Sequence, residues 1–294
     1  MAKCVSCKKS AQIKIAFAPF CESCFLKHYQ NRVERLIKKF KLIEEKDKIL
    51  VAVSGGKDSM SCAHVLSKFR QRFKFEMGVL HIDVGVSDCT NENTENIIRD
   101  FCNEYKVPFY LLKIKEYLGL DIKEVSKKIR RPICSICGMV KRYALNKFAR
   151  ENGFNKIATG HCADDITLLF FKNWFSYYFD WIAKFKPIMP SNHPKIVTRI
   201  RPLFECLEEE NLTYVKLNKI KIAGCSKYSY SVRKDKLKEI LKLIDSKKPD
   251  FKINFVRALE RVEIKVKEPD SIKECIKCGE PTDKEICGVC RLKM

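Results

Sequence analysis

The chemistry of this chain is most visible in its cysteines. Ten of its sixteen cysteines stand in five CxxC pairs. Two pairs lie near each end of the chain, whereas Cys134 and Cys137 form a single pair in the middle, within the basic stretch RRPICSICGMVKRYALNKFA. Thiolates at this spacing bind soft metals or undergo redox chemistry. A pair without a neighbouring pair must find its other ligands elsewhere in the fold.

The terminal pairs have the spacing of zinc ribbons. CVSC and CESC are separated by 13 residues, and CIKC and CGVC are separated by 8 residues. Four thiolates hold Zn²⁺ tetrahedrally, and the metal supplies folding free energy that so short a segment does not obtain from a hydrophobic core. We therefore predict two zinc sites, whose ligands are Cys4, Cys7, Cys21 and Cys24 at one end and Cys275, Cys278, Cys287 and Cys290 at the other.

A second chemical motif, SGGKDS, lies between an apolar run and a helical pattern. Two glycines allow a tight turn that points backbone N–H groups at an anion, and the helix N-terminus and Lys57 add positive charge. The motif is not a Walker A loop, because Asp58 follows the lysine where that loop has Ser or Thr. It resembles the PP-loop of the ATP pyrophosphatases, which release pyrophosphate and transfer AMP to an oxygen of their substrate. The predicted ATP-binding residues are Ser54, Gly55, Gly56, Lys57, Asp58 and Ser59.

Polar residues also follow two further apolar runs. His81 and Asp83 close the first run in LHIDVGVS, and Gly160 follows the second in ATGHCADD. Ligands of open α/β sheets bind at the carboxyl ends of the strands, so these three residues are predicted beside the nucleotide. Asp164 and Asp165 could hold Mg²⁺ on the phosphates or act as a general base, and one of them is expected to cap the next helix.

These motifs need a parallel sheet to position them. Short β-branched runs alternate with helical patterns from residue 48 to about residue 203, which predicts an α/β fold with a doubly wound parallel sheet. The resemblance of SGGKDS to a PP-loop implies that this sheet is of the PP-loop, HUP-like Rossmann type. Three parts follow: an N-terminal zinc module at 1–30, a catalytic domain at 31–265 with a helical last part, and a C-terminal zinc module at 266–294. Strands are expected in KILVAVSGG, FEMGVLHID, PFYLLKI and KIATG, and helices at 57–72, 90–105 and 137–152.

The charge of the chain indicates a polyanionic partner. With 58 Lys and Arg against 36 Asp and Glu, the net charge of +22 attracts nucleic acid of any sequence. Residues 123–150 contain nine Lys or Arg and one Glu, so a basic surface is expected around the central CxxC pair. The first residues lack the apolar core of a signal peptide, and sixteen cysteines then indicate a reducing, cytoplasmic location away from membranes.

The most apolar stretch, residues 166–185, is crowded with aromatic side chains. It also contains Lys172, Asp180 and Lys184, which a membrane span of about 20 residues would rarely tolerate. We interpret the stretch as a buried helix or a subunit contact. Stacking of its aromatic rings on nucleic-acid bases is the alternative.

The motifs of this chain and the Cys-rich module at each end resemble the TtuA family of tRNA 2-thiouridine synthetases. In chain order, the motifs are SGGKDS, the central CxxC stretch, ATGHCADD, AGCSKYS and FKINFVR. The similarity extends nearly from end to end. It implies a 4Fe-4S cluster that Cys134, Cys137 and the distant Cys225 hold, with one iron left open for sulfide.

The residues alone leave two alternatives for the central pair. One is a redox pair that forms a persulfide. The other is zinc, whose fourth ligand would come from His161, Cys162 or Cys206.

The resemblance also implies two catalytic side chains. Lys141 stands four residues after Cys137, which places both on one face of a helix. The second is an aspartate of the GHxxDD motif, for which Asp165 is preferred over Asp164. The chain departs from the family pattern at the next position, because Ile166 stands where relatives usually have a glutamate, and a metal ligand at that position is therefore lost.

The implied function is that of a tRNA sulfurtransferase. ATP with Mg²⁺ would adenylate the C2 oxygen of a uridine, and sulfur would replace the resulting AMP. The T-loop uridine at position 54 is favoured over the wobble uridine at position 34. Expected partners are tRNA, a second copy of the chain in a homodimer, and a sulfur donor, either a thiocarboxylated ubiquitin-like carrier or free sulfide. The rivals are a ligase that uses an amine nucleophile and a non-catalytic zinc-ribbon RNA-binding protein.

Overall fold

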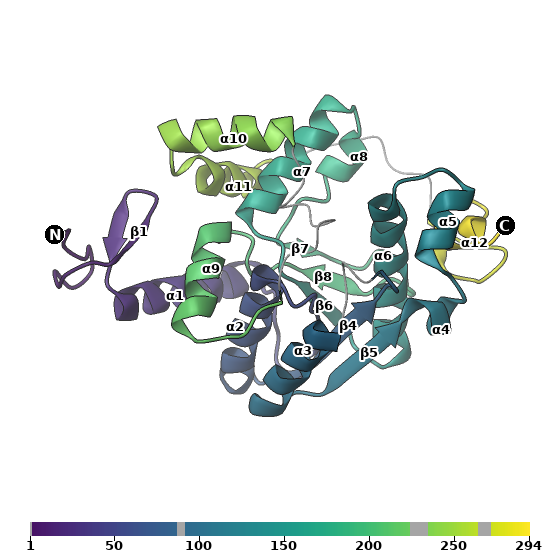
Figure 1. Cartoon of the computed structure of the whole chain (residues 1–294), viewed down its shortest axis with the longest axis horizontal. Coiled ribbons are helices and arrows are strands. Elements are labelled where there is room, and N and C mark those ends of the chain that lie inside the picture. Colours follow the sequence, from purple (N-terminus) through teal and green to yellow (C-terminus); the bar gives the residue numbers. More distant parts are fainter. Residues whose placement is uncertain (1, 87–91, 224–234, 264–271) are drawn as a thin grey trace.

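The computed structural model describes residues 2–86, 92–223, 235–263 and 272–294. Within these residues, six strands form one sheet in the order β5-β4-β3-β6-β8-β7, and only β7 pairs antiparallel with its neighbour (Figure 1). The predicted parallel α/β sheet is thereby confirmed. The strands are β3 (Lys48–Ala52), β4 (Glu76–Asp83), β5 (Phe109–Lys113), β6 (Lys156–Thr159), β7 (Ile188–Met189) and β8 (Thr198–Ile200).

Helices cover both faces of the sheet, which explains the near-continuous apolar strands. Ile49 and Val51 of β3 pack into one core, and Leu50 between them packs into the other. The helices of the first core are α1 (Glu22–Phe40), α2 (Lys57–Phe73), α3 (Glu92–Glu104), α7 (Ala163–Phe175), α9 (Glu208–Leu217) and α11 (Phe251–Arg261). Those of the second core are α4 (Ile114–Leu118), α5 (Ile122–Lys128), α6 (Ile133–Glu151) and α12 (Gly288–Leu292).

The four strands expected from the sequence are present, and the expected helices match α2, α3 and α6. The helix around the central CxxC pair was expected from residue 137, but α6 begins at Ile133 after Pro132. Both cysteines of the pair therefore lie in the first two turns of α6. Strands β7 and β8 were not expected, because two or three residues are too short to show an alternating pattern.

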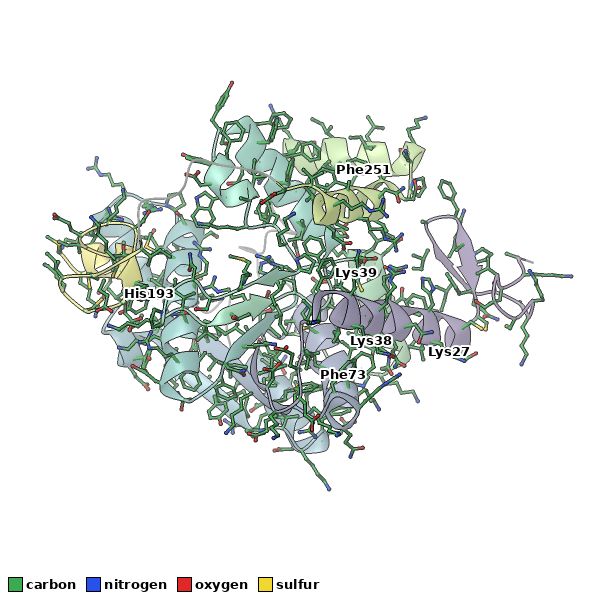
Figure 2. The ribbon with its side chains drawn as sticks, turned by 180° about the vertical axis from the view of Figure 1, so that it is seen from behind. Lys27, Lys38, Lys39, Phe73, His193 and Phe251 are labelled. Atoms are coloured by element: carbon green, nitrogen blue, oxygen red, sulfur yellow. The ribbon has the colours of Figure 1, made fainter. Side chains whose placement is uncertain are left out.

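The two terminal Cys modules lie at opposite ends of the molecule (Figure 1). The N-terminal module contains a hairpin of β1 (Ile13–Ile15) and β2 (Ala18–Phe20), and α1 continues from it through the expected boundary at residue 30. Figure 2 shows Lys27, Lys38 and Lys39 along α1, where Lys38 pairs with Glu34 and Lys39 pairs with Glu260 of α11.

The C-terminal module, with β9 (Lys273–Glu274) paired to β10 (Pro281–Thr282), packs against α6. Its Val289 and Leu292 share the second core with residues of α6. Tyr143 of α6 donates a hydrogen bond to Cys278 Sγ at 3.6 Å, and Arg150 of α6 forms a two-pronged ion pair with Glu280. This module therefore holds the helix that carries the central CxxC pair.

The aromatic stretch at 166–185 is only partly buried, which corrects the expectation of a buried helix. Phe170 of α7 lies in the first core, but Tyr177 is 81% exposed. Trp174, Phe175, Tyr178, Phe179 and Trp181, which lie at the end of α7, in the following turn and in α8 (Phe179–Ile182), are exposed as well. None of the helices in the described segments is long and apolar enough to span a membrane.

Candidate active site

The SGGKDS motif forms the turn from β3 into α2. Gly55 adopts a φ of +83°, which is favourable only for glycine, and Gly56 is the N-cap of α2. Ser59 fixes the turn, since its hydroxyl donates to the Gly56 carbonyl at 3.0 Å and accepts from the Ser54 N–H at 3.1 Å. The unpaired N–H groups of the helix start and its dipole thus meet at the motif, as an anion-binding loop requires.

The surroundings of Gly55 leave no room for a side chain. A Cβ at Gly55 would lie 2.7 Å from Thr94 Cγ2, and its carbonyl accepts a hydrogen bond from the Ala223 N–H at 2.9 Å. Ala223 is two residues before Cys225 in the sequence, and Cys225 itself lies outside the described residues. Ala223, the last described residue before this segment, therefore lies against the phosphate loop.

Lys57 points from the start of α2 into a cavity of about 650 Å³ between the phosphate loop and the C-terminal helices α10 (Lys236–Lys247) and α11. Its ammonium group contacts Glu208 at 2.6 Å and Asp58 at 3.1 Å. Burial alone would lower the pKa of Lys57, but these two carboxylates raise it. The lysine is therefore a permanent cation, and an incoming phosphate would compete with Glu208 for it.

Asp58, Asp164 and Asp165 line an adjoining cavity of about 150 Å³, together with Lys57 and Glu208. Burial raises the pKa of Asp58 to about 6, although Lys57 and Asn211 act in the opposite direction. Burial likewise raises the pKa of Asp165 to about 6, although the Cys162 N–H lowers it. Carboxylates grouped around a lysine at a phosphate loop are chemically suited to hold Mg²⁺ on a nucleotide.

The two aspartates of ATGHCADD differ in their contacts. Asp165 caps α7, because its carboxylate accepts the Cys162 N–H at 3.2 Å. Asp164 accepts the N–H of Glu208 at 2.7 Å and pairs with Lys252 of α11 at 2.6 Å. The expected helix cap is confirmed for Asp165, whereas Asp164 ties together the starts of α7 and α9 and the C-terminal helix α11.

Gly160 lies in the turn after β6 and touches the phosphate loop through its backbone. A Cβ at Gly160 would lie 2.7 Å from the carbonyl oxygen of Asp58 and 2.9 Å from Ser59 Cα. Rigid backbone on both sides cannot make room for it. This contact sets the distance between the Asp164–Asp165 pair and Lys57.

The two predicted nucleotide contacts at the end of β4 have partners within the fold. His81 is buried, and its Nδ1 lies 2.8 Å from the Val53 carbonyl oxygen. Burial is also the main reason that the pKa of His81 is lowered. The Asp83 carboxylate accepts the N–H of Gly85 at 2.9 Å. Both residues stand at the carboxyl edge of the sheet, but neither lines the cavities beside Lys57.

Cys134, Cys137 and Lys141 lie on α6 and are half-buried. Lys141 is close enough to His81 to contribute to the lowered pKa of that imidazole, so it faces the carboxyl end of β4. Among the described residues, no group of three metal-ligating atoms includes Cys134 or Cys137. Zinc at this pair therefore finds no further ligand in His161, Cys162 or Cys206; the last two are buried elsewhere.

The terminal cysteines fit zinc. Each set of four sulfur atoms lies within 4.8 Å of one another, with Cys7 and Cys21 at 3.6 Å and Cys278 and Cys287 at 3.7 Å. A tetrahedral ion with Zn–S bonds of about 2.3 Å requires sulfur separations of about 3.8 Å. Burial opposes ionisation of Cys4, but N–H groups of Cys21, Cys7 and Ser6 lower the pKa of its thiol to about 6. The thiolate that zinc needs is thus favoured.

Three residues around the phosphate loop were not predicted from the sequence: Glu208, Asn211 and Lys252. Asn211 donates to Asp58 at 2.9 Å and accepts from Tyr29 at 2.7 Å. Lys252 bridges Asp164 and Asp245. Their nearest sequence signals are the acidic run EEEN at the start of α9 and FKINFVR at the start of α11. The first does not specify that Glu208 pairs with Lys57, 151 positions away, and the second does not specify that Lys252 pairs with Asp164, 88 positions away.

A methyl group at position 160 should disturb nucleotide binding. Gly160→Ala places a Cβ against the backbone of Asp58 and Ser59, and overpacking of this kind costs about 1–3 kcal/mol. We expect ATP binding to weaken at least about fivefold, measured by isothermal titration, because the loop must move. Gly119→Ala is the control for a strained backbone away from the loop. Gly119 has a positive φ, but a Cβ there would meet nothing within 4 Å. Wild-type ATP affinity in Gly160→Ala would show that this contact does not position the loop.

Comparison with known proteins places the geometry in a family. A family model described as a PP-loop domain matches residues 25–224. The chain is 38% identical to a tRNA-5-methyluridine(54) 2-sulfurtransferase of Pyrococcus horikoshii, over 98% of this chain and 93% of that protein. A protein of the same name from Thermotoga maritima is 34% identical over 99% of this chain and 96% of its own length.

One solved structure has the same fold from end to end. The U34-tRNA thiolase NcsA of Methanococcus maripaludis, solved with its [4Fe-4S] cluster, superposes with a TM-score of 0.81 at 24% identity and covers 99% of this chain and 95% of its own. The PP-loop match and the full-length similarity agree with the loop and sheet described above. The chain therefore belongs to the PP-loop family, among the relatives of the tRNA-5-methyluridine(54) 2-sulfurtransferases.

Proposed function

We propose that this protein is an ATP-dependent tRNA sulfurtransferase that converts the uridine at T-loop position 54 to 2-thiouridine. The observation that carries the proposal is the phosphate loop with its carboxylates, within a chain that matches two position-54 sulfurtransferases along nearly its full length. Position 54 is preferred over position 34, because the thiolase named for position 34 is less similar, at 24% identity.

The first step uses the phosphate loop. ATP phosphates lie against the N–H groups at the start of α2 and displace Glu208 from Lys57. Asp58 and Asp164 provide the carboxylates for Mg²⁺. The C2 oxygen of the uridine attacks the α-phosphorus, and pyrophosphate leaves. The N3 proton of the uracil is lost in this step, and Asp165 is the carboxylate that we assign to accept it.

The second step replaces oxygen by sulfur. Sulfide attacks C2 of the adenylated uridine, Lys141 stabilises the negative charge that develops there, and AMP leaves with the original C2 oxygen. The N3 proton returns as the C2=S bond forms. When bound, a [4Fe-4S] cluster with three cysteine ligands would offer one open iron to carry the sulfide. Cys134 and Cys137 are the described residues that would hold it, and Cys225 is the proposed third ligand.

The remaining partners extend this proposal. The basic N-terminal zinc module and the nine Lys and Arg of residues 123–150 provide surface for tRNA phosphates. Zinc in each terminal Cys set stabilises the modules at the two ends. The sulfur donor, a thiocarboxylated carrier or free sulfide, and the homodimer stay predictions.

Metal analysis tests the cluster ligands. Protein purified without oxygen should contain about four iron and two zinc ions per chain, with a brown absorbance band. Cys134→Ala, Cys137→Ala and Cys225→Ala should each lose the iron, keep the zinc and fail to thiolate tRNA. Cys102→Ala, which changes a buried cysteine outside every predicted metal site, should keep both metals. Zinc in place of iron in the wild type, or full thiolation by the three variants, would contradict the assignment.

The raised pKa values of Asp58 and Asp165 predict a pH dependence. Both carboxylates must be ionised to bind Mg²⁺ or take a proton, and both have a pKa of about 6. The kcat/KM for tRNA-dependent pyrophosphate release should therefore fall as the pH falls through about 6, since kcat/KM reports the free enzyme.

Acid stability needs its own control. A carboxyl whose folded pKa lies above its unfolded value stabilises the fold at low pH and loses that contribution as the pH rises through the folded pKa. Burial acts in the opposite direction at His28, His64 and His161, because it lowers their pKa to about 4 and their contribution to stability is lost as the pH falls from about 6.5. The thermal midpoint at pH 5.5 therefore shows whether the protein stays folded where kcat/KM falls. A flat kcat/KM between pH 5 and pH 7.5 would contradict the roles given to the two aspartates.

A further inference from the structure

Three arginines and a histidine gather beside the central CxxC pair, outside the cavities at Lys57. Arg142 lies on α6, Arg199 on β8, Arg201 directly after β8, and His161 after β6. Arg199 Nη2 donates to the Arg142 carbonyl at 3.5 Å. A Cβ at Gly138, the residue after Cys137, would lie 3.4 Å from Arg142 Nη1. The Arg142 guanidinium thus covers the first turns of the CxxC helix.

The group has no carboxylate partner in the described part of the chain, although the Cys137 thiol is a negative neighbour of Arg142 when it is ionised. None of the ion pairs there involves Arg142, Arg199 or Arg201. Arg201 donates to the carbonyls of Lys184 and Lys186, which leaves Arg142 and Arg199 as the accessible guanidinium groups. Burial and the neighbouring arginines lower the pKa of Arg199 and Arg201, and burial with all three arginines lowers that of His161 to about 4. Like charges held this close favour a bound anion.

An aromatic ring completes the arrangement. Arg142 lies over the Trp181 ring with its Cζ 5.8 Å from the ring centroid, and Lys184 Nζ lies 4.7 Å from the same centroid. Trp181 is 48% exposed despite these two cations. A forked cation that binds phosphate, next to an open aromatic ring that stacks on a base, is the recurring combination of single-stranded nucleic-acid sites.

We propose that Arg142, Arg199 and Trp181 form a nucleotide-binding site that holds the tRNA residue next to the reacting uridine. The two arginines bind its phosphate, and Trp181 stacks on its base. The site lies between the CxxC helix α6 and the end of β8, and Arg142 directly follows Lys141 in α6. This inference rests on the proposed function. A second copy of this chain fits the site less well than RNA does, because its net charge of +22 would add positive charge beside the arginines.

Salt-dependent binding of an unmodified tRNA transcript tests the site. The anaerobically purified holoprotein is compared with Arg142→Gln, Arg199→Gln and Trp181→Ala by filter binding at several KCl concentrations. Each arginine variant should bind roughly tenfold more weakly and reduce the slope of log K against log [KCl] by about one. Trp181→Ala should weaken binding without changing the slope, because stacking releases no counterion.

Arg99→Gln is the matched control. Arg99 is also an exposed guanidinium over an aromatic ring, Phe109 at 4.7 Å, but it lies on α3 beside β5, at the far edge of the sheet. It should bind tRNA as the wild type does. Iron content and ATP affinity should be unchanged in all four variants, which separates lost tRNA contacts from a damaged active site.

Three results would overturn the site. Wild-type affinity and slope in Arg142→Gln and Arg199→Gln would show that these arginines do not bind a tRNA phosphate. Normal tRNA binding with a raised requirement for sulfide would assign the arginines to the sulfur donor instead. Conversion of a dimer to a monomer by Trp181→Ala would assign the ring to a subunit interface. A wild-type protein that neither binds nor thiolates the transcript would contradict the proposed function itself.

Discussion

The site depends on one close contact between two turns of the sheet. The backbone after β6, at Gly160, lies directly against the backbone of the phosphate loop at Asp58 and Ser59, with no room for a side chain between them. Because β3 and β6 are adjacent parallel strands, their carboxyl ends meet at the same edge. The carboxylates that begin α7 are thereby placed beside Lys57 at the start of α2. Asp164 extends this arrangement to α9 and α11, which close the cavity over the phosphate loop.

The helix α6 brings a different set of groups to the same edge. It carries two of the proposed cluster ligands in its first turns and Lys141 one turn later. The C-terminal Cys module holds α6 in place through the Arg150–Glu280 ion pair and the hydrogen bond from Tyr143 to Cys278. Zinc in that module would stabilise the surface on which α6 rests, so a structural metal at the end of the chain supports chemistry in its middle.

The sequence predicted the parts of this fold that local patterns determine. Strand–helix alternation, the two glycines of SGGKDS and the Cys spacings each follow from short-range geometry, and the sheet, the loop and both four-sulfur groups are present. Contacts between distant segments were not predictable. Glu208 reaches Lys57 across 151 positions, and an acidic run at a helix start gives no sign of it. Aromatic composition suggested a buried helix or a subunit contact for residues 166–185. The rings from Trp174 to Trp181 are exposed in the single chain, so the buried helix is wrong there and the subunit contact stays a prediction.

The central claim is that ATP activates the uridine by adenylation of its C2 oxygen, so the fate of that oxygen is the most direct test. A tRNA with ¹⁸O at C2 of the target uridine, prepared by ligation of a synthetic fragment, is thiolated by the anaerobically purified protein with ATP and sulfide. Mass spectrometry of the nucleotides should find one ¹⁸O in the AMP for each 2-thiouridine formed. A tRNA labelled at C4 should give unlabelled AMP. Thiolation that releases unlabelled AMP from the C2-labelled tRNA would contradict adenylation of this oxygen.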